Sequence, residues 1–337
     1  MGNRIMKQFP DKYDNIIFDM DGVITSEENY WNAAALTVWE YLNWNMGRDI
    51  DCTECIQNTS AIRSRVFCDD ELIVVLKNKG VNSNWDLGYV TVLIAWAVGG
   101  KDKMCGFDRV LEYAKELPDN ILEAYDNLAG QAAEKTGFDY DWLERNGLMW
   151  QTMQRLFQGW YLGDDAAAQF NKGKTGFCHD EQPIIAMDDL HAMLSQLHGC
   201  GCRLSIATGR LASELIGPLK KWDVLKYFSQ DGICTYDYVV EAEKETSMTL
   251  TKPHPYMFLK ALYGTGFSDK NIVNENYDKK KIERTLVVGD AGADMFAAKA
   301  MGADFCAVLT GVNKQAARGF FEENNAQYIL NSSAELI

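Results

Sequence analysis

The hydrophobic and polar positions of the second half of the chain alternate between two patterns. Short apolar runs, typical of buried strands, are separated by longer segments whose apolar residues recur three and four apart. Strands that alternate with helices predict a parallel sheet with helices on both faces. The expected strands are 203–208, 232–239, 284–290, 305–311 and 327–330, and the expected helices are 188–201, 213–222, 255–266 and 293–302.

The first half shows one short strand followed by a long helical region. Asn15–Phe18 is an apolar run that ends in acidic residues, as expected of a buried parallel strand. From about Glu28 to Leu42, apolar residues recur at helical spacing. Further segments of helix length follow, with little strand signal, at 71–80, 89–100, 107–117, 120–137 and 147–163.

These patterns predict one α/β core that is interrupted by a helical insertion. Right-handed crossovers align parallel strands, so the strand at 15–18 must join the same sheet as the strands of the second half. We therefore expect a Rossmann-like parallel-sheet core with helices on both faces, formed by residues 12–25 and 186–337, and an inserted all-α domain at 26–185. A length of 337 residues fits two domains.

Composition narrows the class of partner and the compartment. The 33 basic and 48 acidic residues give a net charge of −15, which argues against nucleic acid or an anionic membrane as partner. The most apolar run, 90–100, is too short to cross a bilayer and predicts a buried helix. With no apolar segment typical of a secretion signal at the N-terminus and an odd number of cysteines, nine, we expect reduced thiols and a cytoplasmic location.

Candidate chemistry gathers where the predicted strands end. Asp19 and Asp21 follow the first strand, and two carboxylates so close in sequence repel each other unless a cation or a proton lies between them. The other strand ends and the loop before 255–266 contribute Thr208, Gly209, Lys252, Asp290 and Asp294. Four carboxylates with one lysine favour Mg²⁺, which prefers oxygen ligands. A phosphoryl group would complete such a site.

Four motifs, in this order, carry a family resemblance: "DMDGV", "ATGR", "KPHP" and "GDAGAD". They resemble the signature motifs of the haloacid dehalogenase superfamily. More closely, they resemble its members with a helical C1-type cap after the first motif, such as phosphoglycolate phosphatases and β-phosphoglucomutase. The resemblance covers the core nearly end to end. It covers the position of the insertion but not its sequence.

The resemblance implies catalytic roles for four residues and a phosphate-binding role for a fifth, Gly209. Asp19 would be the nucleophile that forms an aspartyl-phosphate. Asp21 would protonate the leaving oxygen and then deprotonate the attacking water. Thr208, assisted by the amide of Gly209, would hold the phosphoryl group, and Lys252 would bridge Asp19 and the phosphoryl oxygens.

The resemblance also implies a Mg²⁺ site. Asp290 would bind the ion directly, together with Asp19 and the main-chain carbonyl of Asp21, and Asp294 would bind it directly or through water. The residue after Asp290 is often a serine in relatives but is Ala291 here. The presence of Asp21 argues against carbon–halogen cleavage, which needs no general acid at that position.

Three functions remain open at this point. The first is a Mg²⁺-dependent phosphatase acting on a small phosphorylated metabolite. The second is a phosphomutase that uses the same residues to pass the phosphoryl group to a sugar phosphate. The third, ranked last, is a non-catalytic protein that binds an anion. The insertion is expected to govern specificity, with Arg63, Arg65 and Lys172 as candidate readers of an anionic substrate.

Each candidate also has a structural interpretation. Asp294 could cap the helix at 293–302, and Lys252 could be a solvated loop lysine. Arg210 could read a substrate anion or pair with a core carboxylate, and we favour the pairing. The cysteine pairs, Cys52 with Cys55 and Cys200 with Cys202, are interpreted as reduced thiols rather than as a zinc site, which needs four ligands.

Overall fold

The chain forms two compact units. The computed structural model describes residues 12–81, 83–101, 106–163 and 173–337. One unit combines Met1–Glu27 with Glu181–Ile337, and the other is the continuous segment Glu28–Asp180. The expected insertion, 26–185, extends a few residues beyond this helical unit at both ends.

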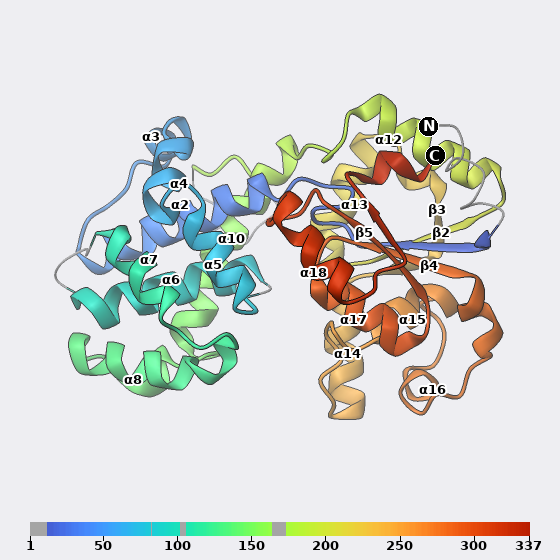
Figure 1. The fold of residues 1–337 in the computed structure, drawn as a ribbon. Helices are drawn as coiled ribbons and strands as arrows, with labels where there is room; N and C mark the ends of the chain where they lie inside the picture. The colour runs from blue at the N-terminus through green and yellow to red at the C-terminus, as the bar shows by residue number, and fades with distance from the viewer. Residues whose placement is uncertain (1–11, 82, 102–105, 164–172) are drawn as a thin grey trace. The chain divides into compact units, whose positions relative to one another are not determined.

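A six-stranded parallel sheet forms the centre of the first unit (Figure 1). Its order is β3-β2-β1-β4-β5-β6, and it consists of β1 (Asn15–Phe18), β2 (Arg203–Ala207), β3 (Phe228–Cys234), β4 (Thr285–Gly289), β5 (Asp304–Val308) and β6 (Tyr328–Leu330). β1 lies between β2 and β4, with Phe18 opposite Ile206 on one side and Val288 on the other. The N-terminal strand therefore joins the sheet as predicted, and the predicted α/β class is confirmed.

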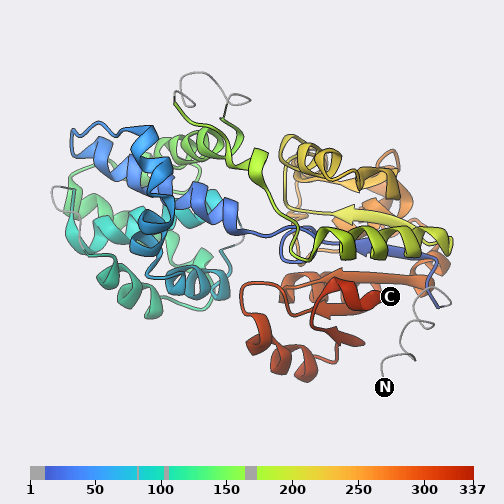
Figure 2. The same cartoon turned by 90° about the horizontal axis from the view of Figure 1, so that it is seen from above.

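Helices cover both faces of this sheet, as Figure 2 shows from above. They are α12 (Met187–Gly199), α13 (Ala212–Lys221), α14 (Tyr236–Thr246), α15 (Tyr256–Tyr263), α16 (Asp269–Val273), α17 (Gly292–Met301) and α18 (Arg318–Glu323). Ile16 and Phe18 pack in one core cluster with α12 and α13. Ile17, between them, packs in a second cluster with α15 and α17. Both faces are therefore buried, which explains the continuous apolar runs of the strands.

One predicted strand is misplaced. The sequence predicts a strand over 232–239, but β3 covers Phe228–Cys234 and α14 covers Tyr236–Thr246. β3 is an edge strand, and its middle is exposed and polar, so it lacks the apolar run that identifies the central strands. The apolar residues that follow it instead form the buried face of α14, through Val239 and Ala242.

The second unit is entirely helical in its described residues. Its helices are α2 (Glu28–Asn45), α3 (Cys52–Gln57), α4 (Thr59–Phe67), α5 (Glu71–Asn78), α6 (Asn84–Gly99), α7 (Phe107–Lys115), α8 (Tyr125–Thr136), α9 (Tyr140–Leu143) and α10 (Leu148–Leu162). α6 contains the most apolar run of the chain and is buried over nearly its whole length, so the predicted buried helix is confirmed. None of the helices described is both long and apolar enough to span a membrane.

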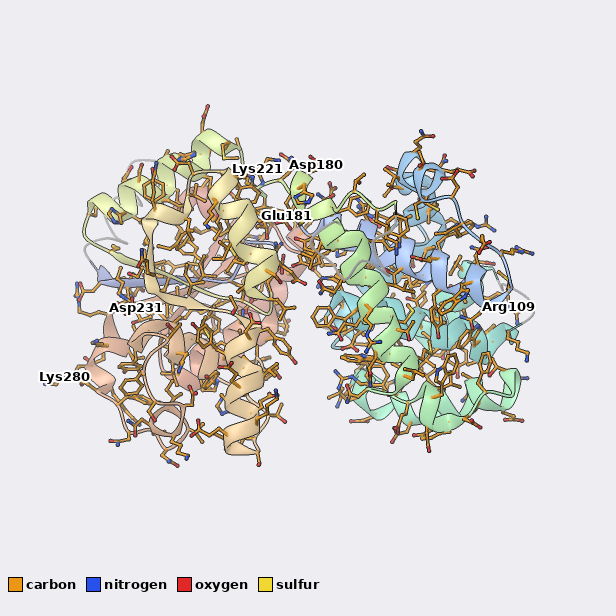
Figure 3. All side chains as sticks on the ribbon, turned by 180° about the vertical axis from the view of Figure 1, so that it is seen from behind. Arg109, Asp180, Glu181, Lys221, Asp231 and Lys280 are labelled. Atoms are coloured by element: carbon orange, nitrogen blue, oxygen red, sulfur yellow. The ribbon has the colours of Figure 1, made fainter. Side chains whose placement is uncertain are left out.

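Charged side chains lie mainly on the outside of each unit. Lys221, Asp231 and Lys280 are exposed on the α/β unit, and Arg109 is exposed on the helical unit (Figure 3). The charged residues that are buried are therefore the informative ones, because a charge removed from water requires a partner.

Candidate active site

Three neighbouring strands deliver polar residues to one edge of the sheet. Asp19, Thr208 and Asp290 directly follow β1, β2 and β4. Because the three strands are parallel and in register, their next residues lie at the same edge. The backbone amide of Asp19 still donates to the carbonyl of Val288 at 2.9 Å, which ties the start of the loop to the sheet.

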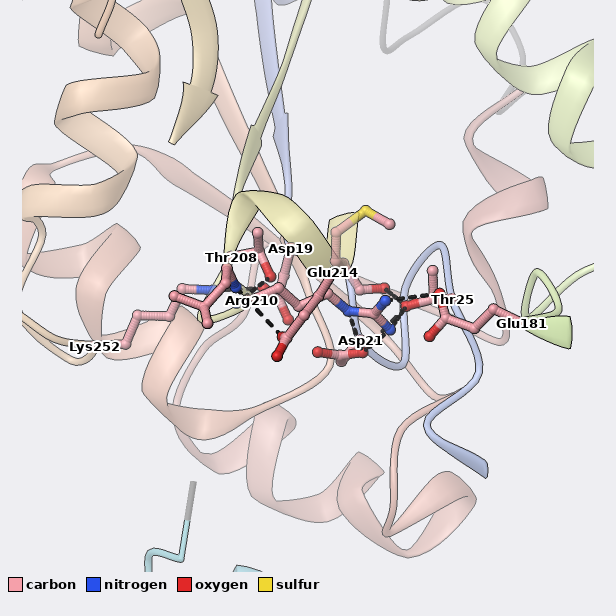
Figure 4. Close-up of polar contacts among 10 residues, drawn as sticks. Asp19, Asp21, Thr25, Glu181, Thr208, Arg210, Glu214 and Lys252 are labelled. Atoms are coloured by element: carbon pink, nitrogen blue, oxygen red, sulfur yellow. Dashed lines mark hydrogen bonds and ion pairs between the residues drawn. The ribbon is translucent and has the colours of Figure 1, made fainter. Parts of the chain in front are cut away.

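Lys252 joins this edge from the segment between α14 and α15. Its Nζ lies 2.7 Å from Asp19 Oδ1 and 2.8 Å from Asp294 Oδ1, and Figure 4 shows the contact with Asp19. The side chains of all three residues are largely buried. The structure thus brings together residues 233 positions apart in the chain, and Lys252 is not a solvated loop lysine.

A third carboxylate completes a compact acidic group. Asp19, Asp290 and Asp294 each place a carboxylate oxygen within 4.8 Å of the others. Two glycines leave room for the Asp290 carboxylate: a Cβ added at Gly22 or Gly311 would lie 2.5 or 1.9 Å from its Oδ2. Gly22 also has a φ of +72°, a conformation that favours glycine. The position of Asp290 therefore depends on the loops after β1 and β5.

Burial and mutual repulsion shift the ionisation of this group. Burial raises the pKa of Asp19 to about 7, the Lys252 charge opposes that rise, and Asp294 and Asp21 add to it. Burial acts to lower the pKa of Lys252, but Asp19 and Asp294 outweigh it and raise that pKa. Lys252 is therefore a fixed positive charge, whereas the acids have an excess of negative charge.

The donor set fits Mg²⁺. Three carboxylates at one place supply the hard oxygen ligands that this ion prefers, and a single lysine leaves them under-neutralised. Asp19, Asp290 and Asp294 would hold the ion. The side chain of Asp21 does not belong to this acidic group. Its main-chain carbonyl stays a predicted ligand.

Asp21 is directed to a different partner, the guanidinium of Arg210. Arg210 Nε donates to Asp21 Oδ1 at 3.0 Å, and Nη2 also donates to that oxygen. Arg210 also donates to Glu181 Oε2, at 2.7 Å, and to Thr25 Oγ1, at 2.8 Å (Figure 4). Pairing with a core carboxylate, the interpretation favoured for Arg210, is therefore what the structure shows.

Thr208 and Gly209 form the turn after β2. Thr208 is fully buried, and its Oγ1 accepts a hydrogen bond from the Arg210 amide at 3.1 Å. Gly209 is exposed, with no neighbouring atom near the place where a Cβ would lie. The hydroxyl proton of Thr208 and the amide of Gly209 are the donors that this turn could offer to an anion.

Asp294 combines its predicted functional position with a structural one. It lies in the first turn of α17, and its Oδ2 accepts from the amide of Ala291 at 3.3 Å. Its other oxygen, Oδ1, faces Lys252. The residue thus supports the start of the helix while it takes part in the acidic group.

The structure shows further residues that position the predicted ones. Gly311 follows the apolar run of β5, so the same strand-end rule could have identified it. Thr310, next to it, donates from its hydroxyl to the carbonyl of Gly22 and so joins the two loops. Glu181 gave no signal, because it lies in a segment with neither strand nor helix periodicity.

The candidate substrate readers in the helical unit have local partners. Arg63 donates from Nε to Asp70 at 2.8 Å, and the Arg65 guanidinium lies 5.1 Å from the centre of the Trp39 ring. Lys172 falls outside the described residues. The cysteines that the structure describes are free thiols, and they include the neighbours Cys52 and Cys55 and the neighbours Cys200 and Cys202.

A comparison with protein-family models identifies the family of this chain. A family model for haloacid dehalogenase-like hydrolases matches residues 13–302. No curated protein sequence matches the chain. Among solved structures, a Northeast Structural Genomics Consortium target is similar over 96% of this chain and 97% of its own, with 28% identity and a TM-score of 0.77.

Two further solved structures are similar at lower levels. One is a predicted phosphoglycolate phosphatase from Haemophilus somnus 129PT, with 16% identity, a TM-score of 0.48 and 96% of both chains covered. The other is a haloacid dehalogenase-like protein of unknown function from Agrobacterium tumefaciens C58, with 16% identity, a TM-score of 0.43 and 96% of both chains covered. Similarities this weak carry no conclusion about substrate.

Proposed function

Since the chain belongs to the haloacid dehalogenase-like hydrolases, as its four motifs predicted, we propose that it is a Mg²⁺-dependent phosphatase. It would hydrolyse a small phosphomonoester through a phosphorylated Asp19. One observation carries the proposal: Lys252 lies within 2.8 Å of both Asp19 and Asp294 in a group that also contains Asp290. Asp21 follows Asp19 closely enough to serve the same reaction.

The first half of the reaction transfers the phosphoryl group to the protein. A carboxylate oxygen of Asp19 attacks phosphorus, and the bond from phosphorus to the ester oxygen breaks as the new bond forms. Asp21 gives its proton to the departing oxygen, so the product leaves as a neutral alcohol. Asp21 is then a carboxylate, and Asp19 carries the phosphoryl group.

The second half restores the protein. The Asp21 carboxylate takes a proton from a water molecule, whose oxygen attacks phosphorus. The bond between phosphorus and Asp19 breaks, inorganic phosphate leaves, and Asp21 is again protonated. Two carboxylic acids, one as nucleophile and one as proton carrier, thus account for every atom and proton of the hydrolysis.

The other residues stabilise negative charge on the transferring group. The Lys252 ammonium neutralises phosphoryl oxygens, and the Thr208 hydroxyl and the Gly209 amide donate hydrogen bonds to them. When bound by Asp19, Asp290 and Asp294, Mg²⁺ would supply the positive charge that offsets repulsion between these carboxylates and the phosphoryl oxygens.

Turnover and trapping test this proposal together. The chain is incubated with Mg²⁺ and a panel of p-nitrophenyl phosphate, primary alkyl phosphates and sugar phosphates, and phosphate release is measured. An acid quench during turnover, followed by mass spectrometry, should find one added phosphoryl group on the peptide that contains Asp19. Absence of turnover across the panel, or a phosphoryl group on another residue, would contradict the proposal.

The phosphomutase alternative predicts a different product. In that reaction a sugar phosphate, rather than water, accepts the phosphoryl group from Asp19. Analysis of the sugar phosphate reactions by ³¹P NMR separates the two: a phosphatase releases inorganic phosphate in proportion to substrate lost, whereas a mutase yields an isomer. Binding of phosphate with neither product would instead favour the non-catalytic alternative.

A further inference from the structure

Arg210 is a buried guanidinium with an acceptor on each of its nitrogen groups. Its side chain is 1% exposed. Nε and Nη2 donate to Asp21, Nη2 also donates to Thr25, and Nη1 donates to Glu181, whose side chain is 1% exposed. A planar guanidinium that donates hydrogen bonds on three sides has little rotational freedom. It therefore holds the groups that accept those bonds in fixed positions.

The partners of Arg210 come from two segments that are joined to each other. The backbone amide of Ser26 donates to Gln182 O at 3.0 Å, and the amide of Ile184 donates to Ile24 O at 2.9 Å. The backbone of Thr25 forms isolated β-bridges with both Asp21 and Pro183. Arg210 therefore contacts two segments that are already fixed to each other by backbone hydrogen bonds.

The hydrogen bonds on Asp21 distinguish its two oxygens. Among the residues that the structure describes, the side-chain hydrogen bonds of Asp21 all end on Oδ1: those from Arg210 Nε and Nη2, and one from Thr25 Oγ1 at 3.2 Å. Oδ2 is the oxygen that remains for a proton. Fixing one oxygen of a carboxyl group also fixes the direction in which the other one points.

We propose that Arg210 is a positioning residue for Asp21: with Thr25, and anchored by Glu181, it holds Oδ1 so that Oδ2 carries and transfers the proton. This inference rests on the proposed function, in which Asp21 is the proton carrier. Arg210 itself touches no reacting atom. Figure 3 labels Glu181, and Figure 4 shows the guanidinium among its three partners.

The leaving group offers a readout that a purely structural role would not move. An alkoxide needs a proton in order to leave, whereas p-nitrophenolate leaves readily without one. Single-turnover phosphorylation of Asp19 should therefore be about 10²-fold slower in R210M with a primary alkyl phosphate, because a misplaced proton donor costs roughly this factor. With p-nitrophenyl phosphate the loss should be within about threefold.

Conservative variants and a matched control separate position from folding. R210K keeps the positive charge but lacks the paired N–H donors of a guanidinium. Its rate with the alkyl phosphate should lie between those of R210M and the parent chain. T25V removes one fixing hydroxyl at nearly constant shape and should show the same substrate dependence with a smaller loss. R203M changes the arginine that begins β2 and pairs with Asp231 at 2.9 Å, and it should not discriminate between the two substrates. If R210M does not fold, R210K and T25V carry the test.

A double-mutant cycle with D21N completes the test. If Arg210 acts through Asp21, R210M should lower the alkyl phosphate rate of D21N by no more than about threefold. A loss in R210M that is equal for both substrates, or that multiplies fully with the loss in D21N, would overturn the inference but not the phosphatase. If D21N itself kept its full rate with alkyl phosphates, the proposed function would fail instead.

Discussion

The two units of the molecule both bury charged residues, but they balance them differently. In the helical unit, Lys174 pairs with Glu40 at 2.7 Å, and Arg145 pairs with Asp86 at 3.1 Å. In the α/β unit, Asp19 and Asp294 share one lysine, Lys252, and a third acid, Asp290, lies beside them. In the first arrangement each acid has its own base, whereas in the second three carboxylates gather around one ammonium group.

This difference indicates where function lies better than burial alone does. The helical pairs gain further support from tryptophans: Trp160 donates to Glu40 at 2.7 Å and Trp150 donates to Asp86 at 2.6 Å. Such groups have the partners that a buried charge needs and require no ligand. A cluster of acids with too few cations is costly unless a cation binds, so it points to a metal.

The largest expected effect tests the α/β side of this comparison. D19N removes the nucleophile and should lower turnover at least about 10³-fold, while the unfolding midpoint stays close to that of the parent chain. Steady-state kinetics and circular dichroism measure the two. D14N is the matched control, because Asp14 is exposed and pairs with Arg284 at 2.6 Å, and it should retain full turnover. Equal losses in both variants would contradict the assignment.

Removal of divalent ions should have the next largest effect. Treatment with EDTA should abolish measurable turnover, and added Mg²⁺ should restore it, because without the ion three carboxylates and the phosphoryl oxygens face the charge of one lysine. Mg²⁺ at about 100 times its dissociation constant should also stabilise the chain by about 2.7 kcal/mol. D290N should lose this stabilisation. Turnover that survives complete chelation would show that the group binds no essential metal.

K252M should have an intermediate effect. It removes the only cation that contacts both Asp19 and Asp294 among the described ion pairs, and a lost charge donor of this kind typically costs about 10²-fold in turnover. K226M is the matched control, since Lys226 pairs with exposed Asp223 on the surface. A change in KM alone, with turnover intact, would limit Lys252 to substrate binding.

In the helical unit, loss of a charge partner should lower the stability of the fold rather than the rate of turnover. E40Q leaves the buried ammonium of Lys174, whose side chain is 2% exposed, without its charge partner. We expect a loss of about 2–3 kcal/mol of unfolding free energy in urea titrations, discounted because Glu40 is partly exposed. Turnover of p-nitrophenyl phosphate per folded molecule should stay within about twofold. E112Q, in the exposed pair with Lys115, should leave the unfolding free energy nearly unchanged.

The smallest effect is expected for the cysteine pair of the helical unit. Burial raises the pKa of the Cys52 thiol and raises that of Cys55 to about 11. Both thiols are therefore protonated near neutral pH, and alkylation should be slow at pH 7 and faster as the pH approaches 11. Replacement of both by serine should leave turnover unchanged. Rapid alkylation at pH 7, or zinc bound at one equivalent, would contradict this interpretation.

The candidate site was predictable from the ends of the strands. Asp19, Thr208 and Asp290 each follow an apolar run, and parallel strands end at one edge, so periodicity alone predicted that these residues are neighbours. It failed at β3, because an edge strand does not need an apolar run on both faces. Helical periodicity likewise identified α2 and α6 but gave no reason to assign a function to any of their residues.

The sequence by itself determined the central strands of the sheet and the residues that converge on its edge. Those features depend on local periodicity and on a rule that all parallel strands share. Only the tertiary structure decided that Arg210 contacts Asp21 and Glu181, and that Gly311 makes room for Asp290. Contacts of this kind depend on the shapes of side chains packed together from distant segments, and no local pattern encodes them.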